Sequence, residues 1–257
     1  MRSRLTRILG AASRLGLVEI KTLLVVLLLA GATWSFAKIA EEVGEGETRG
    51  FDETVLLAMR QPGDTADPIG PRWFEEAARD VTALGGVAVL LIVTLSSTAY
   101  MVMARRPRMA LLLIISVVGA QILSSALKLE FARPRPDLVA HQADVTTASF
   151  PSGHSVMAAA TYLTLGALLA QVQGRRRQKV FLLGFGVVLM FLVGASRVYL
   201  GVHWPTDVLA GWTVGAGWAA LVWLAARLLQ RAGLLRHRSG ETEIPPATER
   251  SSASETS

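Results

Sequence analysis

Long apolar runs recur along this chain and are separated by short polar segments. One of them reads TLLVVLLLAGATWSFA and contains no charged residue. A helix needs about 20 apolar residues to cross the hydrocarbon core of a bilayer, which is about 30 Å thick. Six segments approach that length, and we interpret them as membrane spans: 18–37, 81–104, 109–127, 155–173, 180–196 and 208–226. The sequence therefore predicts an all-α polytopic membrane protein with six transmembrane helices.

The composition agrees with a membrane protein. Hydrophobic residues make up 51% of the 257 residues and the mean hydropathy is +0.42, which is too apolar for an average soluble domain. We expect one membrane domain over 18–230, preceded by a cytoplasmic segment over 1–17. The polar tail over 239–257 is rich in Ser and contains Pro, which predicts disorder. The chain has no cysteine, which excludes disulfides and thiolate metal sites.

The net charge of +6 is distributed in a way that predicts membrane orientation. A single basic stripe would favour nucleic acid, which we do not expect as a partner. Short basic clusters between apolar segments instead favour the cytoplasmic side of a membrane. Four clusters fall on one side if every segment spans: Arg2, Arg4, Arg7 and Arg14; ARRPR at 104–108; QGRRRQK at 173–179; and Arg227, Arg231, Arg236 and Arg238. We therefore expect a bacterial cytoplasmic (inner) membrane protein with both termini in the cytoplasm.

The loop between the first two spans is acidic and lies on the outer side in this topology. Its segments FDETVLLAMR (51–60) and PRWFEEAARDVTAL (71–84) carry apolar residues at helical spacing and predict short amphipathic helices on the outer surface. A cleaved signal peptide is an alternative interpretation of the first span, with the small residues Ser35 and Ala37 near the cleavage point. The apolar run is long for that role, and cleavage would leave the remaining topology unchanged.

Three motifs fall on the same outer face although they are far apart in the sequence. KLEFARPRP (128–136) follows the third span, PSGH (151–154) opens the fourth, and SRVYLGVHWPTD (196–207) joins the fifth and sixth. Ionisable residues at the edge of a membrane are costly and often functional. We therefore expect a single site built from all three motifs.

The residue types in these motifs suit the transfer of a phosphoryl group. His203 and Asp207 are four residues apart, so a helical turn places them on one face, where the carboxylate can hold one ring nitrogen and leave the other as a nucleophile or base. Ser152 and Gly153 lie at a helix start, where free N–H groups favour an anion. The remaining members are a second histidine that could protonate a leaving oxygen and three cations: His154, Lys128, Arg135 and Arg197. The sequence shows no spacing of Asp, Glu and His that is typical of a metal site.

Taken singly, most of these residues have simpler interpretations. Lys128 and Arg197 could be interface anchors, and Arg133 is interpreted as an anchor or a lipid-headgroup contact. PSGH could be a plain helix cap. The aromatic residues near the motifs are interpreted as interface-belt side chains: Tyr199, Trp204 and Trp212. His141 and His237 have no comparable setting. The three motifs together, in order and on one face, are not explained by anchoring.

The pattern K-x6-RP, PSGH and SR-x5-H-x3-D resembles the type 2 phosphatidic acid phosphatase superfamily, which also contains the vanadium haloperoxidases. The matching residues are Lys128, Arg135-Pro136, Pro151-Ser152-Gly153-His154, Ser196-Arg197, His203 and Asp207. With six spans, the resemblance covers about 18–230 and is nearest to the bacterial membrane branch, which includes phosphatidylglycerophosphate and undecaprenyl pyrophosphate phosphatases.

The resemblance implies a metal-independent and cofactor-free lipid phosphate phosphatase. His203 would form a phosphohistidine, Asp207 would orient it, and His154 would protonate the departing oxygen and then activate water. The phosphoryl oxygens would be held by Lys128, Arg135, Arg197, Ser152 and Gly153. The lipid would enter sideways from the bilayer.

Several questions stay open at this stage. Phosphatidate, phosphatidylglycerol phosphate and undecaprenyl pyrophosphate all remain possible substrates, and the oligomeric state is undetermined. The alternatives are a lipid phosphotransferase with the same residues, a vanadate-dependent haloperoxidase, which the six spans argue against, and a transporter or scaffold without catalysis.

Overall fold

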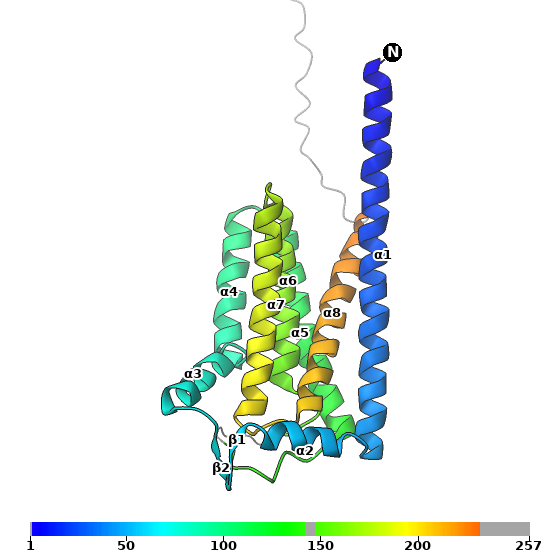
Figure 1. Ribbon diagram of the computed structural model, residues 1–257. Helices are drawn as coiled ribbons and strands as arrows, with labels where there is room; N and C mark the ends of the chain where they lie inside the picture. The colour runs from blue at the N-terminus through cyan, green and yellow to red at the C-terminus, as the bar shows by residue number, and fades with distance from the viewer. Residues whose placement is uncertain (1, 142–146, 232–257) are drawn as a thin grey trace, which may run out of the picture.

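The protein is a bundle of long helices with a cap of short elements at one end (Figure 1). The computed structural model describes residues 2–141 and 147–231. The long helices are α1 (Arg2–Glu45), α4 (Val87–Met103), α5 (Pro107–Phe131), α6 (Gly153–Val172), α7 (Arg176–Tyr199) and α8 (Pro205–Arg231). The expected all-α membrane fold is confirmed. The predicted tail over 239–257 lies outside the described residues.

Five of the long helices are long and apolar enough to cross a membrane. The second predicted span, 81–104, corresponds to a bent pair of helices rather than to one continuous helix. α3 (Arg72–Ala83) ends where the span was expected to begin, and α4 follows after a bend of 50°. The two helices together satisfy the length and composition of a span.

The bend has a steric reason at Gly85. A Cβ atom there would lie 2.5 Å from the Val193 side chain of α7 and 3.2 Å from Cβ and the carbonyl oxygen of His154. Only a residue without a side chain therefore allows the chain to pass so close to α6 and α7. The close approach places the α3–α4 junction directly against one of the motif histidines.

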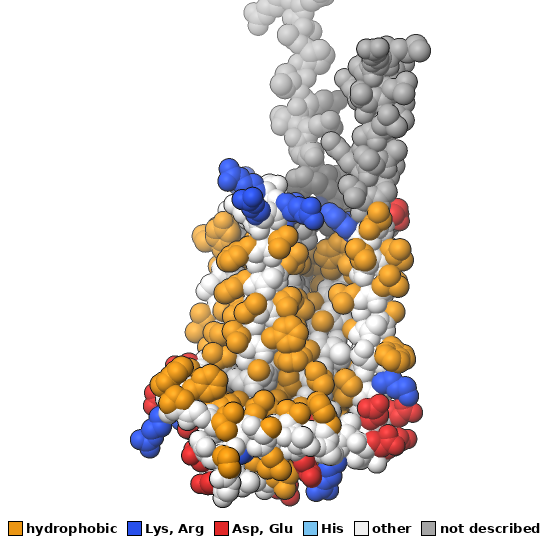
Figure 2. Space-filling model, viewed as in Figure 1, with side chains coloured by type: hydrophobic (Ala, Val, Ile, Leu, Met, Phe, Trp, Pro, Cys, Tyr) orange, Lys and Arg blue, Asp and Glu red, His pale blue; other side chains and the backbone are white. Residues whose placement is uncertain are grey.

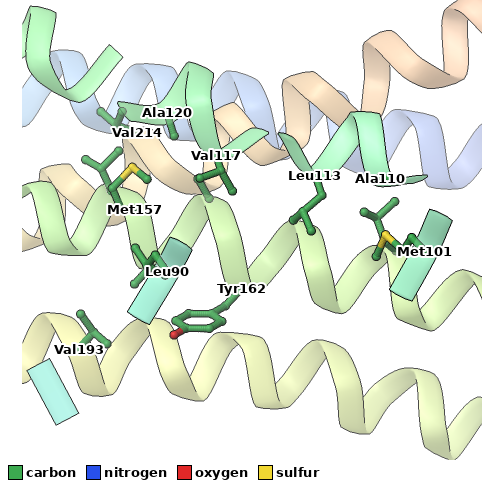
Figure 3. Close-up of a cluster of buried hydrophobic side chains, with 14 residues drawn as sticks. Leu90, Met101, Ala110, Leu113, Val117, Ala120, Met157, Tyr162, Val193 and Val214 are labelled. Atoms are coloured by element: carbon green, nitrogen blue, oxygen red, sulfur yellow. The ribbon is translucent and has the colours of Figure 1, made fainter. Parts of the chain in front are cut away.

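α6 is the central helix: α4, α5, α7 and α8 pack against it, and α1 packs against α8. In its apolar window 67% of the residues are buried, against none in the window of α1. The main core cluster includes Leu113 and Val117 of α5, Met157 and Tyr162 of α6, and Val193 of α7 (Figure 3).

Small residues let the neighbouring helices approach α6 closely. A Cβ at Gly186 of α7 would lie 2.7 Å from the Tyr162 carbonyl oxygen, and one at Gly215 of α8 would lie 2.4 Å from the Val156 carbonyl oxygen. Close backbone packing of this kind is a main source of helix association in a bilayer. The outer surfaces of the helices carry a broad apolar band that suits contact with lipid (Figure 2).

Short elements cover one end of the bundle. They are α2 (Arg49–Leu57), a two-stranded antiparallel hairpin of β1 (Arg60–Gln61) and β2 (Asp64–Pro68), and α3. The two predicted amphipathic helices correspond to α2 and α3. The hairpin was not predicted, and residues 58–60, which were expected to be helical, leave the helix to enter it. Its tight turn contains Gly63 at φ 89°, a conformation that favours glycine.

Candidate active site

The three motifs meet at the end of the bundle that α2 covers. α5 ends at Phe131, Ala132 adopts a left-handed conformation, and the chain continues as the extended segment RPRP (133–136), because proline disfavours further helix. Two backbone hydrogen bonds join the motifs: Ser149 N–H donates to the Arg133 carbonyl at 2.9 Å, and Ser152 N–H donates to the Asp207 carbonyl at 3.0 Å. The structure therefore brings the three motifs together at one end of the bundle.

His203 and Asp207 form a buried pair at the start of α8. The Nδ1 atom of His203 lies 3.3 Å from Oδ2 of Asp207, and the two side chains are 2% and 0% exposed. The same carboxylate oxygen accepts the Trp204 N–H at 3.0 Å and the Ser149 hydroxyl. Because a carboxylate only accepts hydrogen bonds, Nδ1 carries the proton and Nε2 is left unprotonated, as an acceptor for the Arg135 guanidinium. The pair is thus set to present Nε2 as a nucleophile.

Arg135 contacts Nε2, and two further cations of the motifs, Lys128 and Arg197, lie nearby. The Arg135 guanidinium lies 3.3 Å from Nε2 of His203, and it donates to the Val202 carbonyl at 2.6 Å and the Thr147 carbonyl at 2.8 Å. Lys128 donates to the Ala148 carbonyl. Arg197 is 4% exposed and donates to the Thr82 hydroxyl at 3.2 Å. Within the described part of the chain, none of the three cations forms an ion pair with a carboxylate, so together they favour an added anion.

Gly153 and His154 begin α6 beside these cations. A Cβ at Gly153 would touch the Lys128 side chain at 3.4 Å, so glycine keeps the helix start open to the lysine. His154 is half-buried and lies within electrostatic range of Lys128, Arg197 and His203. Both predicted histidines therefore lie close enough to interact electrostatically.

Ser152 already forms hydrogen bonds within the protein through its hydroxyl and its backbone N–H. Its hydroxyl oxygen accepts a hydrogen bond from Ser155 at 3.0 Å, and its backbone N–H is already bonded to Asp207. The Ser152 hydroxyl hydrogen remains available for one donation, because the hydrogen in that bond comes from Ser155.

Arg133 is not an interface anchor, and that interpretation is wrong. One guanidinium nitrogen lies 2.7 Å from Asp207 Oδ1 and the other lies 2.8 Å from Asp52 Oδ2. Asp52 is fully buried and also accepts the Thr206 N–H at 2.9 Å and the Thr206 hydroxyl at 2.7 Å. Arg133 thus joins the orienting aspartate to a carboxylate on α2.

Asp52, Ser149 and Thr206 were missed by sequence reasoning as parts of this site. Asp52 lies on the same helical face as Leu56, which is completely buried. An acid on the apolar face of an amphipathic helix was the available signal, because a buried charge requires a partner.

The aromatic residues Tyr199, Trp204 and Trp212 form hydrogen bonds inside the protein, so their interpretation as interface-belt side chains is wrong. Trp204 is 8% exposed, and its indole N–H donates to the Pro134 carbonyl at 3.2 Å. Tyr199 donates to the Ile69 carbonyl at 2.9 Å, and Trp212 donates to the Met190 carbonyl at 3.0 Å. These bonds hold the outer elements against α7 and α8.

Burial sets the protonation state of His203. Loss of water lowers its pKa from 6.5 to about 4, while Asp207 raises the pKa and the nearby Arg197 and Arg135 lower it. Burial also lowers the pKa of Arg135, and the charge of Asp207 opposes that shift. His203 is therefore neutral at pH 7, as a nucleophile must be.

Among the described residues we find no group of three or more His, Asp and Glu side chains arranged to hold a metal ion.

Comparisons with known proteins agree with this geometry. The model of the PAP2 superfamily matches residues 109–231. Phosphatidylglycerophosphatase B of Bacillus subtilis (strain 168) is 32% identical over 188 residues, which cover 70% of this chain and 85% of the relative. Undecaprenyl-diphosphatase of Sulfolobus acidocaldarius is 32% identical over 148 residues, covering 53% of this chain and 68% of the relative. The crystal structure of a transmembrane PAP2 type phosphatidylglycerolphosphate phosphatase from Bacillus subtilis aligns with a TM-score of 0.70 and 29% identity, covering 79% of this chain and 98% of that one.

The Asp52–Arg133 contact predicts a large effect on stability. Replacing Asp52 by Ala removes one partner of a buried ion pair and should lower the free energy of unfolding by about 3–5 kcal/mol. Glu53 is the matched control, because it pairs only with Arg49, whose side chain is 74% exposed. Glu53→Ala should cost less than about 1 kcal/mol. Unfolding of the purified variants in detergent measures both, and equal stabilities would contradict the role given to Asp52.

The lowered pKa of His203 predicts a dependence of stability on pH. Between pH 6.5 and about 4 the unfolded chain binds a proton at residue 203 that the folded protein does not bind. Stability should therefore fall as the pH is lowered through this window, by at most about 1.4 kcal/mol per pH unit. The His203→Gln variant should lack this component when its unfolding is followed over the same range. Parallel curves for the two proteins would show that His203 titrates normally.

Proposed function

The chain belongs to the PAP2 superfamily and is a membrane lipid phosphatase, and we propose that it releases phosphate from a lipid monophosphate or pyrophosphate through a phosphohistidine on His203. The observation that carries the proposal is the buried His203–Asp207 pair, whose unprotonated nitrogen contacts Arg135, a cation that has no carboxylate partner among the described residues. A tetrahedral oxyanion completes such a site by supplying the missing negative charge.

The first step forms one bond and breaks another at phosphorus. Nε2 of His203 attacks, the bond from phosphorus to the lipid oxygen breaks, and His154 gives its proton to that oxygen. Asp207 stabilises the positive charge that develops on His203. The phosphoryl oxygens are held by Lys128, Arg135, Arg197, the Ser152 hydroxyl and the Gly153 N–H.

The second step returns the protein to its starting state. His154, now neutral, takes a proton from a water molecule, and the resulting hydroxide displaces Nε2 from phosphorus. Inorganic phosphate leaves, and both histidines regain their first protonation states. His154 begins α6 within electrostatic range of Lys128, Arg197 and His203, and the negative charge of the bound phosphoryl group offsets these cations and favours the proton that the first step needs.

An apolar cleft between α1, α5 and α8 supports entry of the substrate from the bilayer. The cleft measures about 210 Å³, and its lining includes Phe36, Leu127 and Trp218. Leu127 directly precedes Lys128, and Phe36 stacks on Phe150 at 5.9 Å, next to Ser149. A lipid chain in this cleft would therefore end at the cations. Similar proteins are named for phosphatidylglycerol phosphate and undecaprenyl diphosphate, so we propose these two lipids and phosphatidate for the first assays.

Phosphatase activity provides the direct test. The purified protein should release inorganic phosphate from these lipids in detergent, with no loss of rate in EDTA. His203→Ala should reduce the rate by roughly a thousandfold or more, because it removes the nucleophile. His141→Ala is the matched control, since His141 contacts the Pro136 carbonyl outside the pocket, and it should retain activity. Wild-type turnover in the His203 variant would refute the assignment.

We also propose a bacterial inner membrane location with both termini in the cytoplasm and the site on the outer face. Arg105 and Arg106 lie just before α5, and Arg175 and Arg176 lie at the start of α7, at the end of the bundle opposite the site. Positive loops favour the cytoplasmic side.

Reporter fusions test this orientation. An enzyme reporter that is active only in the cytoplasm should be active at the C-terminus and inactive when inserted in the turn at Gly63. The reverse pattern would place the site on the cytoplasmic face.

A further inference from the structure

A second groove lies at the end of the bundle opposite the candidate active site. It measures about 430 Å³ and is bounded by α1, α6, α7 and α8. Its floor is made of small side chains, which leave room where larger residues would close the helix contacts: Ala167, Ala170, Ala216, Ala219 and Ala220. Figure 2 shows a hollow between the bundle and α1, below basic side chains. The groove is therefore an open apolar slot that faces the bilayer.

Two lysines lie at the polar end of this groove. Lys21 of α1 and Lys179 of α7 line it together with the Gln171 amide of α6. In the described part of the chain, neither lysine forms an ion pair. Two cations beside an apolar channel at the membrane edge complement a molecule with an anionic head and a hydrocarbon tail.

The walls of the groove are held in place by Arg227 of α8. Its Nε donates to the Thr22 hydroxyl of α1 at 3.0 Å, and its guanidinium lies 5.2 Å from the Trp223 ring centre. Trp223 itself lines the groove. α1 is thus fixed to α8 beside Lys21, so the groove exists before any ligand enters, which lowers the entropic cost of binding.

We propose that this groove binds one anionic phospholipid from the leaflet opposite the candidate active site. Its phosphate lies between Lys21 and Lys179, and an acyl chain lies on the alanine floor. The groove is separate from the catalytic pocket: Lys179 and Arg197 lie at opposite ends of α7, about 27 Å apart along the helix. The inference does not depend on the proposed reaction.

Native mass spectrometry of the full-length protein in neutral detergent tests this site. With phosphatidylglycerol and phosphatidylcholine added in equal amounts, the wild-type protein should retain one phosphatidylglycerol per chain. The double variant Lys21→Gln/Lys179→Gln should retain it about tenfold less, because both headgroup contacts are lost. Equal retention by the wild type and this variant, or equal retention of the two lipids by the wild type, would overturn the proposal.

Three further variants separate this groove from other sources of binding. Arg105→Gln/Arg106→Gln removes two exposed charges from the same end of the bundle but away from the groove, and it should retain the lipid. Ala219→Leu keeps both lysines but fills the floor, and it should lose the lipid. Lys128→Gln weakens the catalytic cation cluster and should retain it. Loss in either retaining variant, or full retention in Ala219→Leu, would place the lipid elsewhere.

Discussion

The ion pairs of Arg133 hold together the short elements and helix ends at the outer end of the molecule. Arg133 lies between two buried carboxylates, one on α2 and one on α8, and forms an ion pair with each. Asp52 in turn accepts two hydrogen bonds from Thr206, at the start of α8. Asp207 receives Arg133 on one oxygen and His203 on the other. One guanidinium group therefore joins the helix that covers the bundle to the carboxylate that orients the nucleophile.

The remaining cations of the site have neutral partners instead of carboxylates. Arg133 is neutralised by protein carboxylates, whereas Lys128, Arg135 and Arg197 are held by carbonyl and hydroxyl oxygens. Neutral partners fix the positions of these side chains and leave their charge uncompensated. Their positive field and the loss of water also disfavour a proton on His203. The same arrangement that attracts a phosphate thus keeps the attacking nitrogen unprotonated.

The sequence predicted the parts of this structure that follow from local pattern. Apolar length predicted the spans, and the spacing of His203 and Asp207 predicted their contact. The bend at Gly85 could not be predicted, because it depends on the approach of Val193 and His154 from distant helices. The same holds for Trp204, which has the composition of an interface residue but is buried by the extended RPRP segment. Arg133 was misinterpreted since its partner, Asp52, is 81 residues away and is brought close only when α2 folds over the bundle.

Gly85, at the bend between α3 and α4, also limits which substitutions the protein tolerates. Most of α4 faces lipid, where one apolar side chain can replace another at little cost. Residue 85 has no such freedom, because His154 and Val193 occupy the space that a side chain at this position would need. A single added methyl group there would press on the first turn of α6 from a neighbouring span. The tolerance of this part of the chain to substitution therefore ends at one position, which is set by Val193 and by the backbone of a histidine in the candidate active site.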